Sequence, residues 1–226
     1  MNGIKHLGII LDGNRRYATA KGLPPWEGHR LGIKNGNKLI SEWMVDLNIK
    51  ELTLYLFSMQ NFNRDPKEVK FLMKLFKEWL KSLDFKELKK KGIKVNFIGR
   101  IYLFSKDIHS SMKEIMEKTK DNENHIVNLA MGYGGQEEIV DAVNTILKEG
   151  RLKQVDEKEF SKYLYLQSEP DIIIRTGGAR RTSNFLVWQS WYSEWFFTEK
   201  TWPEFTKEDL VKVMEEYKKR ERRFGK

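Results

Sequence analysis

The chain has 226 residues, of which 40% are hydrophobic and 32% charged, a composition typical of a folded protein with a heavily charged surface and not of a disordered one. Its 41 Lys and Arg residues exceed its 32 Asp and Glu residues, and the net charge of +9 favours an anionic partner such as nucleic acid, a phosphorylated metabolite or acidic lipid. The lack of cysteine excludes disulfides and thiolate metal sites, and no apolar run has the length of a membrane span, so we expect a cytoplasmic protein.

Short apolar runs rich in β-branched residues alternate with segments whose apolar residues recur at helical spacing. The runs predict buried strands over residues 6–11, 52–58, 93–99, 125–131 and 171–175. This alternation predicts one α/β domain over residues 1–226, with a central, mostly parallel sheet flanked by helices. In such folds ligands bind beyond the carboxyl ends of the strands.

One predicted helix, over residues 65–91, is unusually long and amphipathic. Its lysines lie on one face, and the other face carries Leu72, Leu75, Phe76, Trp79, Leu80 and Leu83. The apolar face either packs on the core in the ordinary way or forms a wall of a hydrophobic ligand tunnel. The pattern by itself leaves both interpretations open.

The first strand leads directly into Asp12-Gly13-Asn14-Arg15-Arg16. A glycine lets the backbone approach phosphate oxygens, a helix N-terminus favours negative charge, and arginine supplies paired donors, so this segment can cradle a diphosphate. Asp12 can hold a magnesium ion that bridges the phosphates. The alternative is a β-turn-α connection with a helix-capping aspartate and solvent-exposed arginines.

The second strand ends in a polar segment, Ser58 to Arg64, that stands before the next predicted helix. Its hydroxyl, amides, aromatic ring and guanidinium can orient a small phosphorylated alkene. Ser and Asn in front of a helix are also ordinary capping residues, so the structural interpretation stays open here.

The strand over residues 171–175 delivers the strongest anion-binding pattern, which runs from Arg175 to Asn184. Three arginines and three hydroxyl side chains surround the glycine pair Gly177-Gly178, and glycine N–H groups beside arginines form a phosphate nest. Arginines clustered at one turn repel each other unless an anion is present. The alternative is a flexible basic surface loop.

Two other phosphate-binding patterns are missing. Residues 132–137 begin like a dinucleotide fingerprint but place Glu137 where the third glycine should stand, and no GxxxxGK[ST] loop occurs. No pair of adjacent aspartates is present, so the DDxxD signature of the helical trans-prenyltransferases is absent.

The motifs together resemble the cis-prenyltransferases, that is, undecaprenyl diphosphate synthases and their dehydrodolichyl relatives. The resemblance covers nearly the whole chain in order and is closer to archaeal and eukaryotic members. It rests on DGNRRYA (residues 12–18), Gly28-His29, LTLYLFS with NFNR, NLAMGYGG, IIIRTGG, RTSNFLVWQ, WYSEWFF and RERRFG. It implies an α/β fold with a hydrophobic tunnel that receives the growing chain.

The resemblance also implies roles for individual residues. Asp12 is expected to act on the metal ion and the diphosphate, with Glu194 as a second magnesium ligand. Ser58 and Asn61 match the region implicated in proton removal. The residues expected to bind substrate are Gly13, Asn14, Arg15, Arg16, Tyr17, His29, Phe62, Arg64, Arg175, Arg181, Thr182, Ser183, Arg223 and Gly225.

As an enzyme of this family the chain is expected to use Mg²⁺ and to add isopentenyl diphosphate repeatedly to farnesyl or geranylgeranyl diphosphate, which makes the precursor of a glycosyl carrier lipid. The family further implies a homodimer, with Arg223 and Gly225 reaching the partner's site, and transient peripheral membrane association for product release. Four positions depart from the commonest family pattern, and they are Pro25, Gln60, Phe62 and Ala179.

Two alternatives compete with the enzyme. A non-catalytic partner subunit of the same family would supply only the C-terminal element, and Asp12, Arg175, Arg181 and Glu194 argue against it. A nucleic-acid-binding protein is suggested by the basic residues 218–223, but Glu215, Glu216 and Glu221 dilute that stretch, so we expect no nucleic-acid partner.

Overall fold

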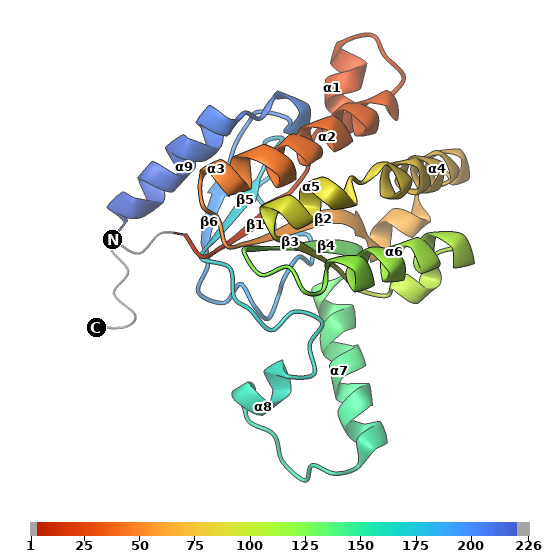
Figure 1. Ribbon diagram of the computed structural model, residues 1–226, viewed down its shortest axis with the longest axis vertical. Helices are drawn as coiled ribbons and strands as arrows, with labels where there is room; N and C mark the ends of the chain where they lie inside the picture. The colour runs from red at the N-terminus through yellow and green to blue at the C-terminus, as the bar shows by residue number, and fades with distance from the viewer. Residues whose placement is uncertain (1–3, 221–226) are drawn as a thin grey trace.

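A six-stranded sheet in which every neighbouring pair of strands runs parallel forms the centre of the molecule (Figure 1). The structure, a computed structural model, describes residues 4–220. The strands lie in the order β3-β4-β2-β1-β5-β6. Their bounds are β1 His6–Ile10, β2 Glu51–Ser58, β3 Ile93–Ile98, β4 His125–Tyr133, β5 Ile172–Arg175 and β6 Glu194–Phe197. The predicted α/β fold with a parallel sheet is confirmed.

Helices cover both faces of this sheet. The helices are α1 Asn14–Ala20, α2 Glu27–Lys38, α3 Met44–Asp46, α4 Pro66–Ser82, α5 Phe85–Lys91, α6 Lys106–Thr119, α7 Gly135–Glu149, α8 Glu157–Ser161 and α9 Lys207–Lys219. A π-helical turn, η1 Leu39–Trp43, joins α2 to α3, and the 3₁₀ turns are η2 Met59–Asn63, η3 Ile101–Leu103 and η4 Trp202–Glu204. In Figure 1, α2 to α6 lie on one side of the sheet, and α7 and α8 lie on the other.

Side chains alternate between the two faces along each strand, as the two-residue period of a strand requires. Leu7 and Ile9 of β1 belong to the large core beneath α2 to α6 and α9, whereas Ile10 belongs to a smaller core on the opposite face. The strands have nearly continuous apolar sequences because both of their faces are buried.

The long helix predicted over residues 65–91 is wrong, because two helices occupy this segment. α4 ends at Ser82, and Leu83 takes an extended conformation with ψ of 125°. The Asp84 carboxylate then accepts hydrogen bonds from the backbone N–H groups of Lys86 and Glu87 and so caps α5. The apolar period runs through this break because both helices pack on the same core.

The sheet order brings three strand ends together. β1 lies between β2 and β5, with Ile10 opposite Tyr55 on one side and Arg175 on the other. The residues that follow β1, β2 and β5 therefore meet at one edge of the sheet, where α2 and α4 also pass. None of the helices in residues 4–220 is long and apolar enough to cross a membrane.

Candidate active site

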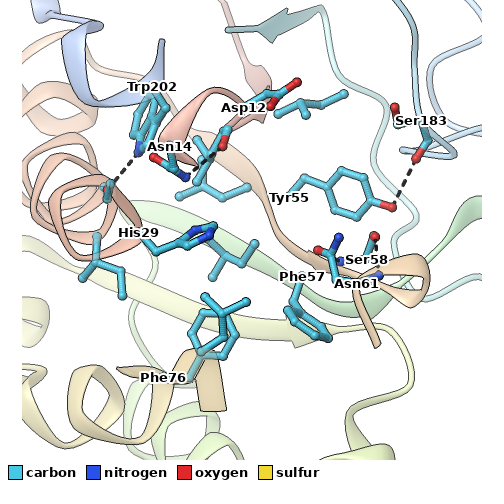
Figure 2. A pocket seen from close by; sticks show the side chains of 18 of the residues that line it. Asp12, Asn14, His29, Tyr55, Phe57, Ser58, Asn61, Phe76, Ser183 and Trp202 are labelled. Carbon is cyan, nitrogen blue, oxygen red and sulfur yellow. Dashed lines mark hydrogen bonds between the residues drawn. The ribbon is translucent and has the colours of Figure 1, made fainter. Parts of the chain in front are cut away.

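A cavity of about 600 Å³ opens at the carboxyl ends of β1, β2 and β5 and extends between the sheet, α2 and α4. Figure 2 shows that its two ends differ, with Asp12, Asn14 and Ser183 at one end and Phe57 and Phe76 at the other. Half of the predicted site residues line the cavity, and they are Asp12, Asn14, His29, Ser58, Asn61, Arg64, Arg175, Arg181 and Ser183.

Asp12 and Gly13 form the turn that leaves β1. Gly13 has φ of 102°, and a Cβ atom there would lie 2.7 Å from Cβ of Thr201, so only glycine fits this position. The Gly13 N–H group donates to Oδ1 of Asp12 at 2.6 Å. This turn therefore fixes the Asp12 carboxylate at the mouth of the cavity.

Arg175 is the buried partner of Asp12. Its side chain is only 5% exposed, and Nη2 donates to Oδ2 of Asp12 at 2.9 Å. Nη1 donates to Oγ of Ser183 at 2.6 Å and to the carbonyl oxygen of Arg181 at 2.5 Å. One guanidinium group thus joins the loop after β5 to the loop after β1.

The carboxylate of Asp12 is held in its ionised form. Burial acts to raise its pKa, but the hydrogen bond and charge of Arg175, the Gly13 N–H group and the charge of Arg16 outweigh burial, and the pKa is lowered. Arg16 lies 3.2 Å from Oδ1 of Asp12 and also donates to the carbonyl oxygen of Gly177. Asp12 is therefore available as an anionic ligand or proton acceptor.

The predicted phosphate nest at Gly177 and Gly178 is wrong in one respect. Their N–H groups donate to the carbonyl oxygens of Lys200 and Thr198, at 2.7 and 2.8 Å, and so are not free for an anion. Both glycines have positive φ, near 80°, which lets the chain turn sharply. In this loop the side chains of Arg175, Arg181 and Ser183 line the cavity, and anion binding by them stays a prediction.

Ser58 and Asn61 form a reciprocal cap at the end of β2. The Ser58 N–H group donates to Oδ1 of Asn61 at 3.0 Å, and the Asn61 N–H group donates to Oγ of Ser58 at 3.2 Å. The capping role considered for these residues is thus present, and both side chains also line the cavity. Their part in proton removal stays a prediction.

Glu68 is a site residue that the sequence analysis missed. It lies in the first turn of α4, is 8% exposed, and has Nη1 of Arg64 at 2.9 Å and Nη1 of Arg15 at 3.4 Å. Nε2 of His29 lies 3.6 Å from the same carboxylate. One buried acid thereby positions three groups from different segments, and its spacing of four residues from Arg64 was the signal in the sequence.

His29 is neutral in this site. Burial, the charge of Arg64 and, to a lesser degree, that of Arg15 lower its pKa to about 4, although the charge of Glu68 acts in the opposite direction. Its Nε2 atom makes no hydrogen bond in the described structure. A neutral imidazole can accept or donate one hydrogen bond to a bound ligand.

Three buried polar atoms around the cavity lack a partner among residues 4–220, and they are Oδ1 of Asn14, Nε2 of His29 and Nε of Arg175. Buried polar groups in folded proteins are almost always paired with protein, water or ligand. All three atoms belong to residues that line the cavity.

The deeper part of the cavity is apolar. Leu72, Leu75, Phe76 and Trp79 of α4 face Ile33 and Ile40 from α2 and η1 across it. The amphipathic helix was expected either to pack on the core or to form a wall of a ligand tunnel, and it does both. These side chains line the cavity, while Leu80 packs in the core.

Other predicted site residues lie outside the cavity lining. Arg15 and Arg16 stand at its rim, more than half exposed, and Gly13 forms the turn beneath them. Phe62 packs edge-on against Phe57 with a centroid distance of 4.8 Å. Tyr17 and Thr182 are also absent from the lining, and Arg223 and Gly225 lie outside the described residues.

Glu194 is not brought to Asp12. It begins β6 opposite Ile172, whereas Phe197 is the residue opposite Arg175, so Glu194 stands about 10 Å back along the strand direction. Its carboxylate accepts from Nη1 of Arg220 at 2.6 Å. Glu194 therefore lies away from Asp12 within one chain, and its role as a magnesium ligand stays a prediction.

The residues of the site fit a metal ion that is bound partly by the protein and partly by the phosphate oxygens of a substrate. No group of three or more metal-binding side chains occurs among the described residues, but magnesium commonly binds through one or two carboxylates, with phosphate and water oxygens completing its shell. The ionised, 30% exposed Asp12 side chain provides such a carboxylate.

Known proteins with similar sequences are named as diphosphate synthases or isoprenyl transferases. The family model of undecaprenyl diphosphate synthase matches residues 10–225. A tritrans,polycis-undecaprenyl-diphosphate synthase (geranylgeranyl-diphosphate specific) of Pyrococcus horikoshii is 44% identical over 98% of this chain and 86% of its own length. An isoprenyl transferase of Thermus thermophilus is 41% identical over 98% of this chain and 88% of its own length.

A solved structure of another diphosphate synthase is similar to this chain in fold. Lavandulyl diphosphate synthase from Lavandula x intermedia, in complex with dimethylallyl diphosphate, superposes with a TM-score of 0.91 and 34% identity, covering 99% of this chain and 98% of that one. The similarity in sequence and in overall structure thus extends over nearly the full length of the chain. The chain belongs to the undecaprenyl diphosphate synthase family of prenyl-transferring enzymes.

Proposed function

We propose that this chain condenses isopentenyl diphosphate repeatedly with an allylic prenyl diphosphate to make a long-chain cis-polyprenyl diphosphate. The observation that carries the proposal is the cavity with two chemically different ends. Arginine, aspartate and asparagine side chains stand at its mouth, and leucine and aromatic side chains stand in its depth. A diphosphate with an isoprenoid tail has the same division between a charged head and an apolar chain.

The loops around the mouth provide places for two diphosphates. Asp12, Asn14 and Arg16 on one side suit the allylic substrate, whose tail then enters the cavity. Arg175, Arg181 and Ser183 on the other side suit isopentenyl diphosphate, since two guanidinium groups and a hydroxyl complement phosphate oxygens. The hydrogen bond between Asp12 and Arg175 joins these two sets of side chains, so the two diphosphates would bind next to each other.

Catalysis follows from charge stabilisation at the mouth. As the allylic diphosphate leaves, Arg16 and the neighbouring cations stabilise the growing negative charge in fixed positions. Bound through Asp12 and the diphosphate oxygens, Mg²⁺ would supply further electrostatic stabilisation. Ser58 and Asn61 would position the isopentenyl group while its double bond attacks the cationic carbon and a proton is lost to a nearby base or phosphate oxygen.

Purified protein incubated with radiolabelled isopentenyl diphosphate, Mg²⁺ and either farnesyl or geranylgeranyl diphosphate tests the proposal. We expect butanol-extractable polyprenyl product, no product after chelation, and recovery with added Mg²⁺. The P. horikoshii relative's name specifies geranylgeranyl diphosphate, which we propose as the preferred primer. A chain that binds substrate but yields no product would instead be a non-catalytic partner subunit.

We also propose that the chain acts as a homodimer through the exposed side of α7. Val140, Val143 and Leu147 are 52%, 41% and 72% exposed and follow each other at helical spacing, so they form one apolar stripe. A second copy of the chain would cover this stripe. Light scattering should give a dimer mass that Leu147→Glu reduces to that of a monomer.

Peripheral binding to anionic membranes is the last part of the proposal. Residues 66–94 hold ten lysines against four acidic residues, so they supply +6 of the net charge of +9. They include α4, which walls the cavity and would hold the lipid product, and α5, which follows it. We expect sedimentation with vesicles of anionic phospholipid and none with neutral vesicles, with salt releasing the bound protein.

A further inference from the structure

The loop that carries Ser183 has a strained backbone. Of the four non-glycine residues with positive φ in residues 4–220, three are Ser183, Asn184 and Leu186, at 49°, 64° and 46°. Residues other than glycine keep this left-handed conformation only when the surrounding structure holds them in it. On one side of the loop, Nη1 of Arg175 donates to Oγ of Ser183 at 2.6 Å. The contacts on its other side are made by α7.

Asn184 connects this loop to the first turn of α7. The Gly135 N–H group donates to the carbonyl oxygen of Asn184 at 2.8 Å, and the Gln136 N–H group donates to Oδ1 of the same residue at 2.9 Å. Nδ2 of Asn184 donates to Oε2 of Glu137 at 2.7 Å. Because one side-chain atom accepts and the other donates, these contacts fix the orientation of the amide and suit asparagine.

Gly134 allows the close approach of α7 to the loop. A Cβ atom at this position would lie 2.1 Å from Oε2 of Glu137 and 2.6 Å from Nδ2 of Asn184. Any larger residue would therefore displace the Glu137 carboxylate from the asparagine amide. This packing gives a structural reason for the glycines of residues 132–137, the segment that begins like a dinucleotide fingerprint.

Tyr55 supports the same loop from β2. Its hydroxyl lies 3.3 Å from the carbonyl oxygen of Ser183 (Figure 2). Its ring stacks on Phe185 with the two centroids 4.7 Å apart, and Phe185 and Leu186 are both fully buried. The apolar residues that follow Asn184 are thus fixed in the core, and the hydrogen bonds of Asn184 set the conformation of the residue before it.

We infer that Asn184, held by Glu137, is a positioning residue that keeps the Ser183 hydroxyl against Arg175 for binding of isopentenyl diphosphate. The inference rests on the proposed function, since it takes Ser183 and Arg175 to bind that diphosphate. Without the contact to α7, residues 183–186 can relax to negative φ, and this rotation turns the Ser183 side chain away from Arg175. Glu137 is not among the described residues that line the cavity, so it acts on the substrate through Asn184.

A pair of substitutions that exchanges donor and acceptor tests this contact. Asn184→Asp places a carboxylate beside that of Glu137, so KM for isopentenyl diphosphate should rise at least about tenfold, while KM for the allylic primer should change by less than about twofold. Adding Glu137→Gln lets the new amide donate to the new carboxylate, and KM should return to within about threefold of the wild-type value. Steady-state kinetics of both variants measure the effect.

Two single substitutions of Glu137 leave the loop sequence intact and so do not depend on how well Asn184→Asp folds. Glu137→Gln keeps an oxygen that can accept from Nδ2 of Asn184, and it should leave KM for isopentenyl diphosphate nearly unchanged. Glu137→Ala removes that acceptor and should raise the same KM by at least about threefold. Equal values of this KM in the two variants would contradict the role of the contact.

A matched control separates positioning from general loss of stability. The Asn122 side chain donates to the carbonyl oxygen of Ile93 at 2.8 Å, at the end of the sheet opposite the cavity. Asn122→Asp loses this hydrogen bond and should keep both KM values even if its melting temperature falls. A raised KM in this control would overturn the inference, as would failure of Glu137→Gln to restore Asn184→Asp, which would instead indicate that Asn184 touches the substrate itself.

A binding experiment keeps the two proposals distinguishable. Isopentenyl diphosphate is titrated calorimetrically into the protein in the presence of a non-reactive thiolodiphosphate analogue of the primer. Asn184→Asp should weaken this binding at least about tenfold, and the double variant should restore it. If this pattern is found but no product forms, condensation fails and the positioning role stands. Equal affinities of wild type and Asn184→Asp would refute the positioning role even if product forms.

Discussion

Nη2 of Arg175 lies 2.9 Å from Oδ2 of Asp12, and this contact ties together the ends of two adjacent parallel strands at the mouth of the cavity. Arg175 is buried, but the Asp12 side chain is 30% exposed. The pair therefore keeps a charged carboxylate accessible to a ligand while its partner is fixed in the core.

Removal of the Asp12 charge should damage turnover far more than folding. Asp12→Asn keeps hydrogen-bonding atoms near Arg175 and Gly13 but loses the anionic ligand, so we expect kcat/KM to fall by about 10²–10³-fold. The melting temperature should change by no more than about 2–4 °C. Asp156→Asn, in the cap of α8, is the control that keeps activity. Parallel losses of activity and melting temperature would count against the assignment.

Arg175→Lys should weaken both substrate binding and stability. A lysine ammonium cannot reach Asp12, Ser183 and the Arg181 carbonyl in the planar arrangement of a guanidinium group. We expect KM for isopentenyl diphosphate to rise at least about tenfold and the free energy of unfolding to fall by roughly 1–3 kcal/mol. Arg151→Lys on the surface should change neither. Wild-type steady-state kinetics in Arg175→Lys would refute the role.

Glu68→Gln should act on the substrate through the groups that Glu68 positions. Arg15 and Arg64 lose their shared carboxylate, so KM for the allylic primer should rise by about tenfold, with a smaller change in kcat. Because the Glu68 charge acts to raise the pKa of His29, its loss should lower that pKa further, which an NMR titration measures. The control is Glu78→Gln, on the exposed side of α4. An unmoved His29 titration would show that the contact is unimportant.

His29 should make folding stability depend on pH in the acid range. Its pKa falls from 6.5 to about 4 on folding, so between these values the unfolded chain binds more protons than the folded one. The free energy of unfolding should therefore decrease as pH falls through this window, by up to roughly 3 kcal/mol from this group. Urea unfolding of wild type and His29→Gln between pH 4 and 7 measures the difference. A wild-type slope retained in His29→Gln would assign the effect to other groups.

The strands were predictable because burial on both faces leaves a continuous apolar signal in the sequence. β1 to β5 were found within two residues of their observed ends. β6 was missed, since its four residues, Glu194–Phe197, lie in an aromatic block that has no clear period. The break before α5 was also missed, although Asp84 with Glu87 three residues later is an N-cap pattern.

The sequence predicted the candidate site where the charged and polar residues stand together in one short motif. Asp12, Arg175 and Ser183 stand in such motifs, and the structure brings them together. Glu68 was not recognised, because an acid in the first turn of a helix is common and only the packing of α4 against α2 makes it a partner of His29. The N–H groups of Gly177 and Gly178 were misassigned because their acceptors, Thr198 and Lys200, follow β6.

By itself, the sequence determined the parallel α/β fold, the family and the residues that carry charge at the strand ends, since these depend on local period and on motifs contiguous in the chain. Only the tertiary structure decided which charges pair, which polar atoms remain without a partner, and which side chains line the cavity. Those features depend on distances between segments such as α2 and α4, where Asn37 meets Trp79 across 42 positions of sequence. Side-chain packing sets such distances, and no periodicity in the sequence contains them.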